Sequence, residues 1–229
     1  MRKPRRSKPK IKRNFQTINL TKEEFYKLKS TKILTAGSGN VAAKLMVNLA
    51  NSGIGTIGMI ENNKAEKVLP EVQKYNYNAL IQIHNEPLDS DDADKIIQEY
   101  DIIIDCLQNY DLKFRLNELA VKHNKPLLYS SVTEEYTQIA MIVPHETACL
   151  NCMYSPQDLS NHVYEPPTAI LADATSAVQA DFAVDFILEK GHYPVDTMIS
   201  YYHPQQRFTK ITLTRNEDCP VCSKIKAPL

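Results

Sequence analysis

Two pairs of cysteines have the spacing of a metal-binding motif. Cys149 and Cys152 form one C-x-x-C pair, Cys219 and Cys222 form another, and 66 residues separate the pairs. Four thiolates with this spacing suit a tetrahedral zinc site, which has no open coordination position. We therefore expect a structural zinc that fastens the second pair to the segment before residue 153. A redox dithiol and unrelated core cysteines are the alternatives.

A glycine-rich loop is the second candidate site. Gly37-Ser38-Gly39 lies between an expected strand and an expected helix, where backbone amides and the helix N-terminus can meet a phosphate. Ala42 takes the third position of the G-x-G-x-x-G pattern, and Glu61 follows the next strand, where a ribose partner is expected. The pattern predicts nucleotide binding, with a structural turn that binds nothing as the alternative.

The remaining candidate nucleophile is Cys106, which directly follows an expected strand. No histidine lies close to it in the sequence to activate the thiol. We expect a small buried residue there, with a nucleophile as the alternative.

The elements that would position these residues alternate along the chain. Short apolar runs at 32–36, 55–60, 79–84, 101–105 and 126–129 are separated by helical patterns at 40–51, 64–75, 91–100 and 112–123. This order predicts βαβ units and a doubly wound, mainly parallel sheet. Pro70 predicts a kink or a late start in the helix at 64–75.

The second part of the chain has a different pattern. Segments 138–143 and 207–214 alternate like antiparallel strands, with a helix at 172–190 between them, and 153–170 reads as a crossover loop. A helix is expected from Thr21, because Thr21 and Glu24 have capping-box spacing. We expect a basic flexible tail at 1–14 and a single α/β domain over 15–229.

Charge and composition narrow the functional classes. Lys and Arg number 27, as do Asp and Glu, but eight basic residues and no acidic one lie in 2–13. The rest has 19 basic against 27 acidic residues, a net charge of about −8, so nucleic-acid binding outside the tail is not expected. The tail itself is either a solvated segment or an electrostatic docking segment. The apolar runs are too short for a membrane span, and we expect a cytoplasmic protein.

Taken in order, these features resemble the ThiF/MoeB/HesA family of ubiquitin-activating-enzyme-like adenylyltransferases. The resemblance depends on 32–60 (KILTAGSGNVAAKLMVNLANSGIGTIGMI), K-A-E at 64–66, 100–117 (YDIIIDCLQNYDLKFRLN), K-P-L at 125–127 and the two cysteine pairs. It implies a dimer that binds Mg-ATP and adenylates the C-terminal glycine of a ubiquitin-like sulfur carrier or a peptide.

The resemblance also assigns roles to individual residues. It places Gly37, Gly39 and Asn40 in the nucleotide loop and Glu61 at the ribose. It makes Lys64 a phosphate ligand and Arg13 an arginine donated across the dimer to the partner's ATP.

Two departures from the family pattern weaken the expected ATP site. The family's Asp-Asn, whose aspartate helps to bind magnesium-triphosphate, reads Gln108-Asn109, and a segment of about twenty residues that carries an S-N-L-x-R-Q type motif is absent before Lys64. Cations and a metal stabilise the charge that develops in phosphoryl transfer. We therefore expect a divergent activating-type protein. The alternatives are a non-catalytic subunit that supports a competent partner and a dinucleotide-dependent enzyme.

Overall fold

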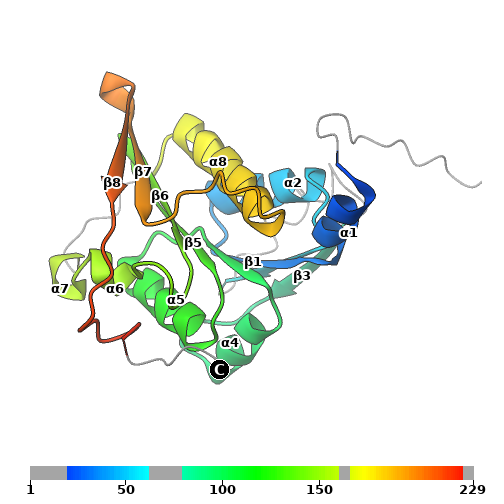
Figure 1. Ribbon diagram of the computed structural model, residues 1–229, viewed down its shortest axis with the longest axis horizontal. Helices are drawn as coiled ribbons and strands as arrows, with labels where there is room; N and C mark the ends of the chain where they lie inside the picture. The colour runs from blue at the N-terminus through cyan, green and yellow to red at the C-terminus, as the bar shows by residue number, and fades with distance from the viewer. Residues whose placement is uncertain (1–19, 62–78, 160–165, 224–229) are drawn as a thin grey trace, which may run out of the picture.

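One sheet of eight strands organises the chain, in the order β3-β2-β1-β4-β5-β6-β7-β8 (Figure 1). The computed structural model describes residues 20–61, 79–159 and 166–223. Strands β1 to β5 run parallel, and β6, β7 and β8 continue the sheet antiparallel. The strands are β1 (Lys32–Ala36), β2 (Thr56–Ile60), β3 (Leu80–His84), β4 (Ile102–Asp105), β5 (Leu127–Val132), β6 (Tyr136–Ile142), β7 (Thr197–Tyr202) and β8 (Arg207–Thr212).

Helices cover both faces of this sheet. The first face carries α1 (Lys22–Ser30), α2 (Asn40–Asn51) and α8 (Ala169–Ile187). The opposite face carries α4 (Asp91–Gln98), α5 (Tyr110–Lys122) and the short α6 (Leu150–Met153), with α7 (Pro156–Leu159) contacting α5. This arrangement confirms the expected doubly wound α/β fold with antiparallel C-terminal strands.

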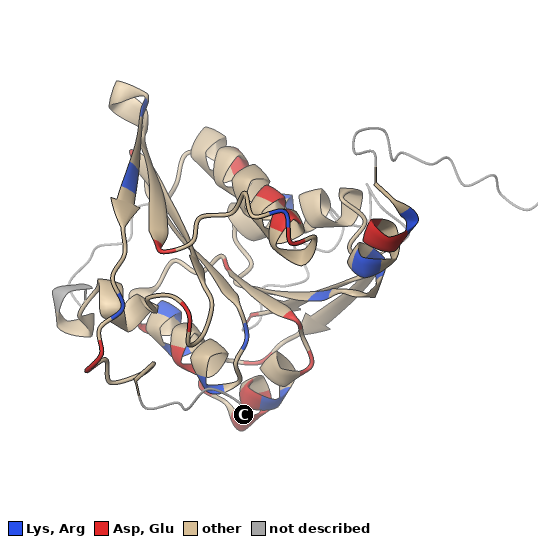
Figure 2. Cartoon of the chain, viewed as in Figure 1, with Lys and Arg blue, Asp and Glu red and all other residues tan. Residues whose placement is uncertain are grey.

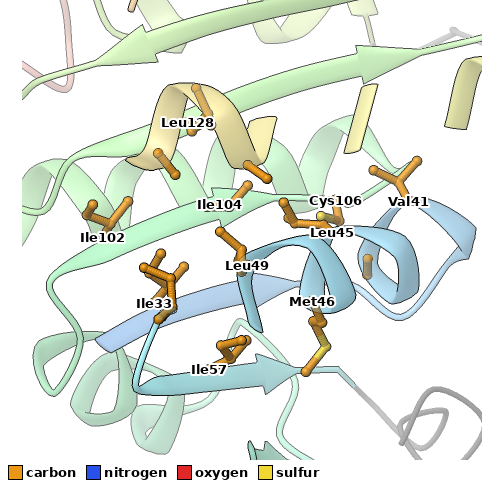
Figure 3. Packing of buried hydrophobic residues seen from close by; sticks show 14 of the residues in the cluster. Ile33, Val41, Leu45, Met46, Leu49, Ile57, Ile102, Ile104, Cys106 and Leu128 are labelled. Atoms are coloured by element: carbon orange, nitrogen blue, oxygen red, sulfur yellow. The ribbon is translucent and has the colours of Figure 1, made fainter. Parts of the chain in front are cut away.

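Alternating strand residues supply two separate cores. Ile33, Ile57 and Ile104 face α2, whose Leu45 and Leu49 pack directly on them (Figure 3). The neighbouring Leu34 and Ile103 point to the other face and pack with α4 and α5. Because both faces of the central strands are covered, these strands are apolar along nearly their whole length.

The boundaries differ from the expected ones mainly in the second part of the chain. The strand β7 was not predicted, and α8 begins at Ala169 and ends at Ile187, earlier than expected at both ends. The interval 153–170 contains α7, and the expected helix at 64–75 lies outside the described residues. The capping box of α1 is confirmed, since Glu24 N–H donates to Thr21 Oγ1 at 3.2 Å and Thr21 N–H donates to Glu24 Oε2 at 2.7 Å.

Within the described ranges, no helix combines the length and the apolar composition that crossing a bilayer requires.

Candidate functional site

The glycine-rich loop lies where the direction of the sheet's connections reverses. Strand β1 has β2 on one side and β4 on the other, and all three run parallel. Their carboxyl ends lead into Gly37, Glu61 and Cys106 respectively, so the three segments meet at one edge of the sheet. In open α/β sheets this topological switch point is the usual place for a ligand.

Two glycines of this loop meet different constraints. Gly37 has φ +108°, and a Cβ there would lie 2.8 Å from the carbonyl oxygen of Cys106. Gly39 is the N-cap of α2, is exposed, and has open space where its Cβ would be. The absence of a side chain at Gly37 therefore allows the loop after β1 to approach the loop after β4 closely. The absence of a side chain at Gly39 leaves the start of α2 accessible.

Glu61 lies next to this loop, as its position in the sequence predicted. The Ser38 hydroxyl donates to Glu61 Oε2 at 3.3 Å, and both residues are partly exposed. The carboxylate is therefore held beside the glycine loop. Asn40 is the first residue of α2 and is exposed.

A buried ion pair supports the loop that follows β4. Lys113 Nζ lies 2.8 Å from Asp105 Oδ2, and the two side chains are 3% and 1% exposed. Lys113 also donates to the Ser130 carbonyl at 2.6 Å, and the other carboxylate oxygen of Asp105 accepts from Leu107 N–H at 2.8 Å. Burial raises the pKa of the Asp105 carboxyl, and the Lys113 ammonium opposes that shift.

This ion pair was missed by the sequence reasoning. The available signal was a lysine at a core position of α5, next to Phe114 and one turn before Leu116 and Asn117, all of which are buried. A charged residue in such a row needs a partner of opposite charge.

Gln108 and Asn109 follow Asp105 in the same loop. Asn109 is the N-cap of α5, and its Oδ1 accepts from Leu112 N–H at 3.0 Å. Gln108 is partly exposed beside it. The side chain of Asn109 therefore has a structural task whether or not the loop binds a ligand.

Cys106 is 3% exposed and packs in the first core. Burial raises the pKa of its thiol, which opposes formation of a nucleophilic thiolate. The structure therefore agrees with the expected buried residue.

The four paired cysteines lie together on the opposite face of the sheet. Their Sγ atoms are all within 4.8 Å of one another, with separations of 3.9 Å for Cys149–Cys152, 3.6 Å for Cys149–Cys219 and 3.5 Å for Cys152–Cys222. Tetrahedral zinc with Zn–S bonds near 2.3 Å would separate its sulfurs by about 3.8 Å. The sulfur arrangement thus fits a metal ion of this kind.

Backbone groups favour the charged thiolate at Cys219, whereas burial raises the pKa of Cys149 and of Cys222. Burial acts to raise the pKa of Cys219, but hydrogen bonds from the backbone of Cys222 and Val221 outweigh it and lower the value. Asn216 N–H also donates to Cys152 Sγ at 3.4 Å. Thiolate is the form that binds metals, so these donors suit a metal centre.

The two remaining candidate residues, Arg13 and Lys64, lie outside the described residues. Gly37, Gly39, Asn40, Glu61, Gln108 and Asn109 lie in the three segments that follow β1, β2 and β4, and the four cysteines lie together elsewhere.

Curated relatives of the chain are named as adenylyltransferases. The adenylyltransferase and sulfurtransferase UBA4 of Candida albicans is 22% identical over 232 residues, covering 88% of this chain and 53% of the relative. The sulfur carrier protein adenylyltransferase of Thermus thermophilus is 22% identical over 227 residues, and the match covers 86% of this chain and 83% of that relative. The chain therefore spans about half the length of relatives such as UBA4 and most of the bacterial one.

Solved structures with the same fold include E. coli MccB. MccB with ATP has a TM-score of 0.74 and 21% identity, covering 87% of this chain and 68% of MccB. The microcin C7 biosynthetic enzyme MccB in complex with N-formylated MccA has a TM-score of 0.75 and 20% identity, and the match covers 87% of this chain and 69% of MccB. At these identities the likeness shows the fold.

The fold and the site define a doubly wound α/β protein with a glycine loop at its switch point and a four-cysteine cluster. The ThiF family model matches residues 59–221 of this chain, which is most of its length. The chain belongs to the ThiF family, and its homologues are adenylyltransferases.

Proposed function

We propose that this protein binds a nucleotide at the switch point and receives the C-terminus of a ubiquitin-like sulfur carrier or a peptide there. In adenylation the terminal carboxylate attacks the α-phosphorus of ATP, and the bond to the β-phosphate breaks as pyrophosphate leaves. The observation that carries the proposal is the open backbone at Gly39, at the start of α2 and beside Glu61. In addition, MccB has been solved with ATP, and a relative is a sulfur carrier protein adenylyltransferase.

The residues have distinct proposed roles at this site. Gly37, Gly39 and Asn40 present the loop to the phosphates, and Glu61 binds the ribose hydroxyls. Lys64 contacts the phosphates, and Arg13 reaches the ATP of the partner subunit. Gln108 and Asn109 border the site on the β4 side, where magnesium would accompany the triphosphate.

Calorimetric titration of Mg-ATP into the purified protein tests nucleotide binding. Micromolar binding that is lost in Glu61→Gln but kept in Glu134→Gln, an exposed carboxylate in the turn before β6, supports the proposal. Pyrophosphate exchange with an acceptor that ends in Gly-Gly, abolished by Lys64→Ala, would extend it to catalysis. Tight binding of a dinucleotide in place of ATP would contradict it.

One observation favours a second candidate, a non-catalytic subunit. Asp105, the carboxylate that ends β4 three residues before Gln108, is buried against Lys113. It is therefore not available to replace the missing magnesium ligand. A protein with this loop would support a dimer with a competent partner and donate Arg13 to it.

A mixing experiment distinguishes the non-catalytic subunit from the nucleotide-binding protein proposed first. The protein should bind no Mg-ATP alone up to millimolar concentration and should raise the activity of a related adenylating partner. The gain should be lost in Arg13→Ala and kept in Arg207→Ala, which changes an exposed arginine of β8. An adenylating activity of the protein alone would exclude this candidate.

For the cysteine cluster, we propose structural zinc. The sulfur separations and the backbone donors described above support it, and zinc would add no open coordination position for chemistry. None of the five cysteines forms a disulfide, as in proteins kept in a reducing compartment, and this supports a cytoplasmic location.

We also propose a dimer, formed by this chain with itself or a related subunit. The outer face of α8 carries exposed apolar residues at helical spacing, namely Ile170, Ala174, Ala177 and Val178. Phe208 of β8, 72% exposed, pairs with Tyr201 and so lies on the same face of the sheet as α8.

Charge on the two elements is complementary. The charged residues of α8 are acidic and those of β8 are basic, so the hairpin of one subunit can meet the helix of another (Figure 2). The projecting end of the β7–β8 hairpin is well placed to reach a second molecule (Figure 1).

A further inference from the structure

The two cysteine pairs come from distant parts of the chain and must be held in register. Cys149 begins the short helix α6, which follows β6, whereas Cys222 lies in a turn after β8. A short helix and a turn have little backbone structure of their own to fix their relative position. Contacts between the two segments therefore decide whether the four sulfurs are preorganised before a metal arrives.

Arg215 makes the most direct of these contacts. Its Nη1 donates to the carbonyl of His145 at 2.7 Å, and its Nη2 donates to the carbonyl of Cys222 at 3.1 Å. His145 lies four residues before Cys149. One guanidinium thus joins the segment before the first pair to the last residue of the second pair.

Two backbone features accompany these contacts. His145 has φ 71°, a left-handed conformation that is uncommon for a residue with a side chain. The next residue after Arg215, Asn216, donates its N–H to Cys152 Sγ at 3.4 Å. Residues 215 and 216 therefore contact both cysteine pairs, one through a side chain and the other through the backbone.

The charge of the guanidinium also suits this position. A divalent metal with four thiolates has a net charge of −2, and the described cluster is largely buried. An arginine hydrogen-bonded to the carbonyl of a ligand residue offsets part of that charge. Arginine reaches the two carbonyls from two different nitrogens of a rigid planar fork, whereas a lysine would have to reach both from a single nitrogen.

We propose that Arg215 is a positioning residue of the metal centre, which slows metal loss by joining the segment before the first cysteine pair to the second pair. This inference rests on the proposed zinc site. Residues that orient metal ligands from outside the coordination sphere typically change metal affinity by about 10–100-fold. Arg215 contacts the backbone carbonyls of His145 and Cys222 and does not itself bind the metal.

Zinc release from the full chain into a chromophoric chelator tests the proposal. Arg215→Met should release zinc ~10–100-fold faster than the unchanged protein. Arg215→Lys keeps the charge but loses the planar fork with its second nitrogen, and it should also release zinc faster. Arg207→Met, at an exposed position of β8, is the matched control and should release at the original rate.

A second measurement separates positioning from misfolding. The cobalt-substituted variants should keep the visible absorption of a tetrahedral tetrathiolate site, and their far-ultraviolet circular dichroism should match that of the unchanged protein. Release at the original rate from Arg215→Met or from Arg215→Lys would overturn the role of the bridge. Absence of stoichiometric metal in the unchanged protein would instead overturn the proposed zinc site.

Discussion

The Lys113 ammonium group lies 2.8 Å from the Asp105 carboxylate at the end of β4, and both side chains are almost completely buried. Removing one partner leaves the other charge unpaired in the interior. Lys113→Met should therefore lower the free energy of unfolding by about 3–5 kcal/mol in chemical denaturation.

A double-mutant cycle with Asp105→Asn checks the cause. The double variant should lose less stability than the two single variants together, because it leaves no uncompensated charge. Lys95→Met, which breaks the exposed Lys95–Asp92 pair, is the control and should have little effect. Additive losses at 105 and 113 would show that the ion pair is not the origin of the effect.

The two glycines of the nucleotide loop should respond differently to the same substitution. Gly37→Ala should destabilise the protein by roughly 1–3 kcal/mol, because φ is +108° and the new Cβ meets the Cys106 carbonyl. Gly39→Ala should cost less than about 1 kcal/mol, the range for a changed N-cap. Its expected defect is in Mg-ATP affinity, measured by calorimetry, and unchanged affinity would argue against the proposed phosphate contact.

The fold could be predicted from the sequence because its signals are local. The runs rich in isoleucine, the glycine loop and the alternation of strands with helices each identify an element without knowledge of the others. Strand β7 was missed because Thr197–Tyr202 contains a mixture of polar and apolar residues, and its pairing with β6 and β8 fixes it as a strand.

Long-range contacts at the sites were harder to predict. The grouping of the cysteines could be anticipated because two C-x-x-C motifs are a recognisable set. The Asp105–Lys113 pair and the bridge from Arg215 to His145 could not, because they depend on how β4 meets α5 and on a carbonyl that has no sequence signature.

The cysteine cluster predicts a metal-dependent stability. The protein should contain about one zinc per chain by metal analysis, in line with a four-cysteine site. Cys222→Ser should lose the metal and unfold at a lower temperature, whereas Cys106→Ala, which changes the cysteine outside the cluster, should keep it. Zinc should also be released as the pH falls, since protons compete for the thiolates. A folded protein without metal would contradict the site.

The outer face of α8 predicts a change of oligomeric state on substitution. Val178→Glu places a charge at the C-terminal end of the apolar stripe and should shift the protein from dimer to monomer in sedimentation equilibrium. Tyr26→Glu on α1, at a position 68% exposed, is the matched control. A Val178→Glu variant that stays dimeric would place the interface elsewhere.

His84 predicts a loss of stability in mild acid. Its Nε2 lies 2.7 Å from Tyr100 Oη, and burial lowers the pKa of the imidazole while Glu99 and Glu86 oppose that shift. Because the folded-state pKa is below the unfolded value of about 6.5, the unfolded chain binds the proton more readily. Stability should therefore fall as the pH decreases through 6.5.

Substitution isolates the contribution of this histidine. His84→Gln should flatten the dependence of the unfolding free energy on pH between about 7 and 5. His203→Gln, at an exposed position, is the control. An unchanged slope in His84→Gln would assign the acid sensitivity to other groups.

The 66 residues between the cysteine pairs delay the appearance of the second pair during protein synthesis. At ~5–20 residues per second, the ribosome needs roughly 3 to 13 s to proceed from Cys152 to Cys219. During that interval the first two thiols are made and the other two are not. All four thiols are present only after strands β7 and β8 have been synthesised. Metal binding by the complete cluster therefore cannot precede the synthesis of these two strands.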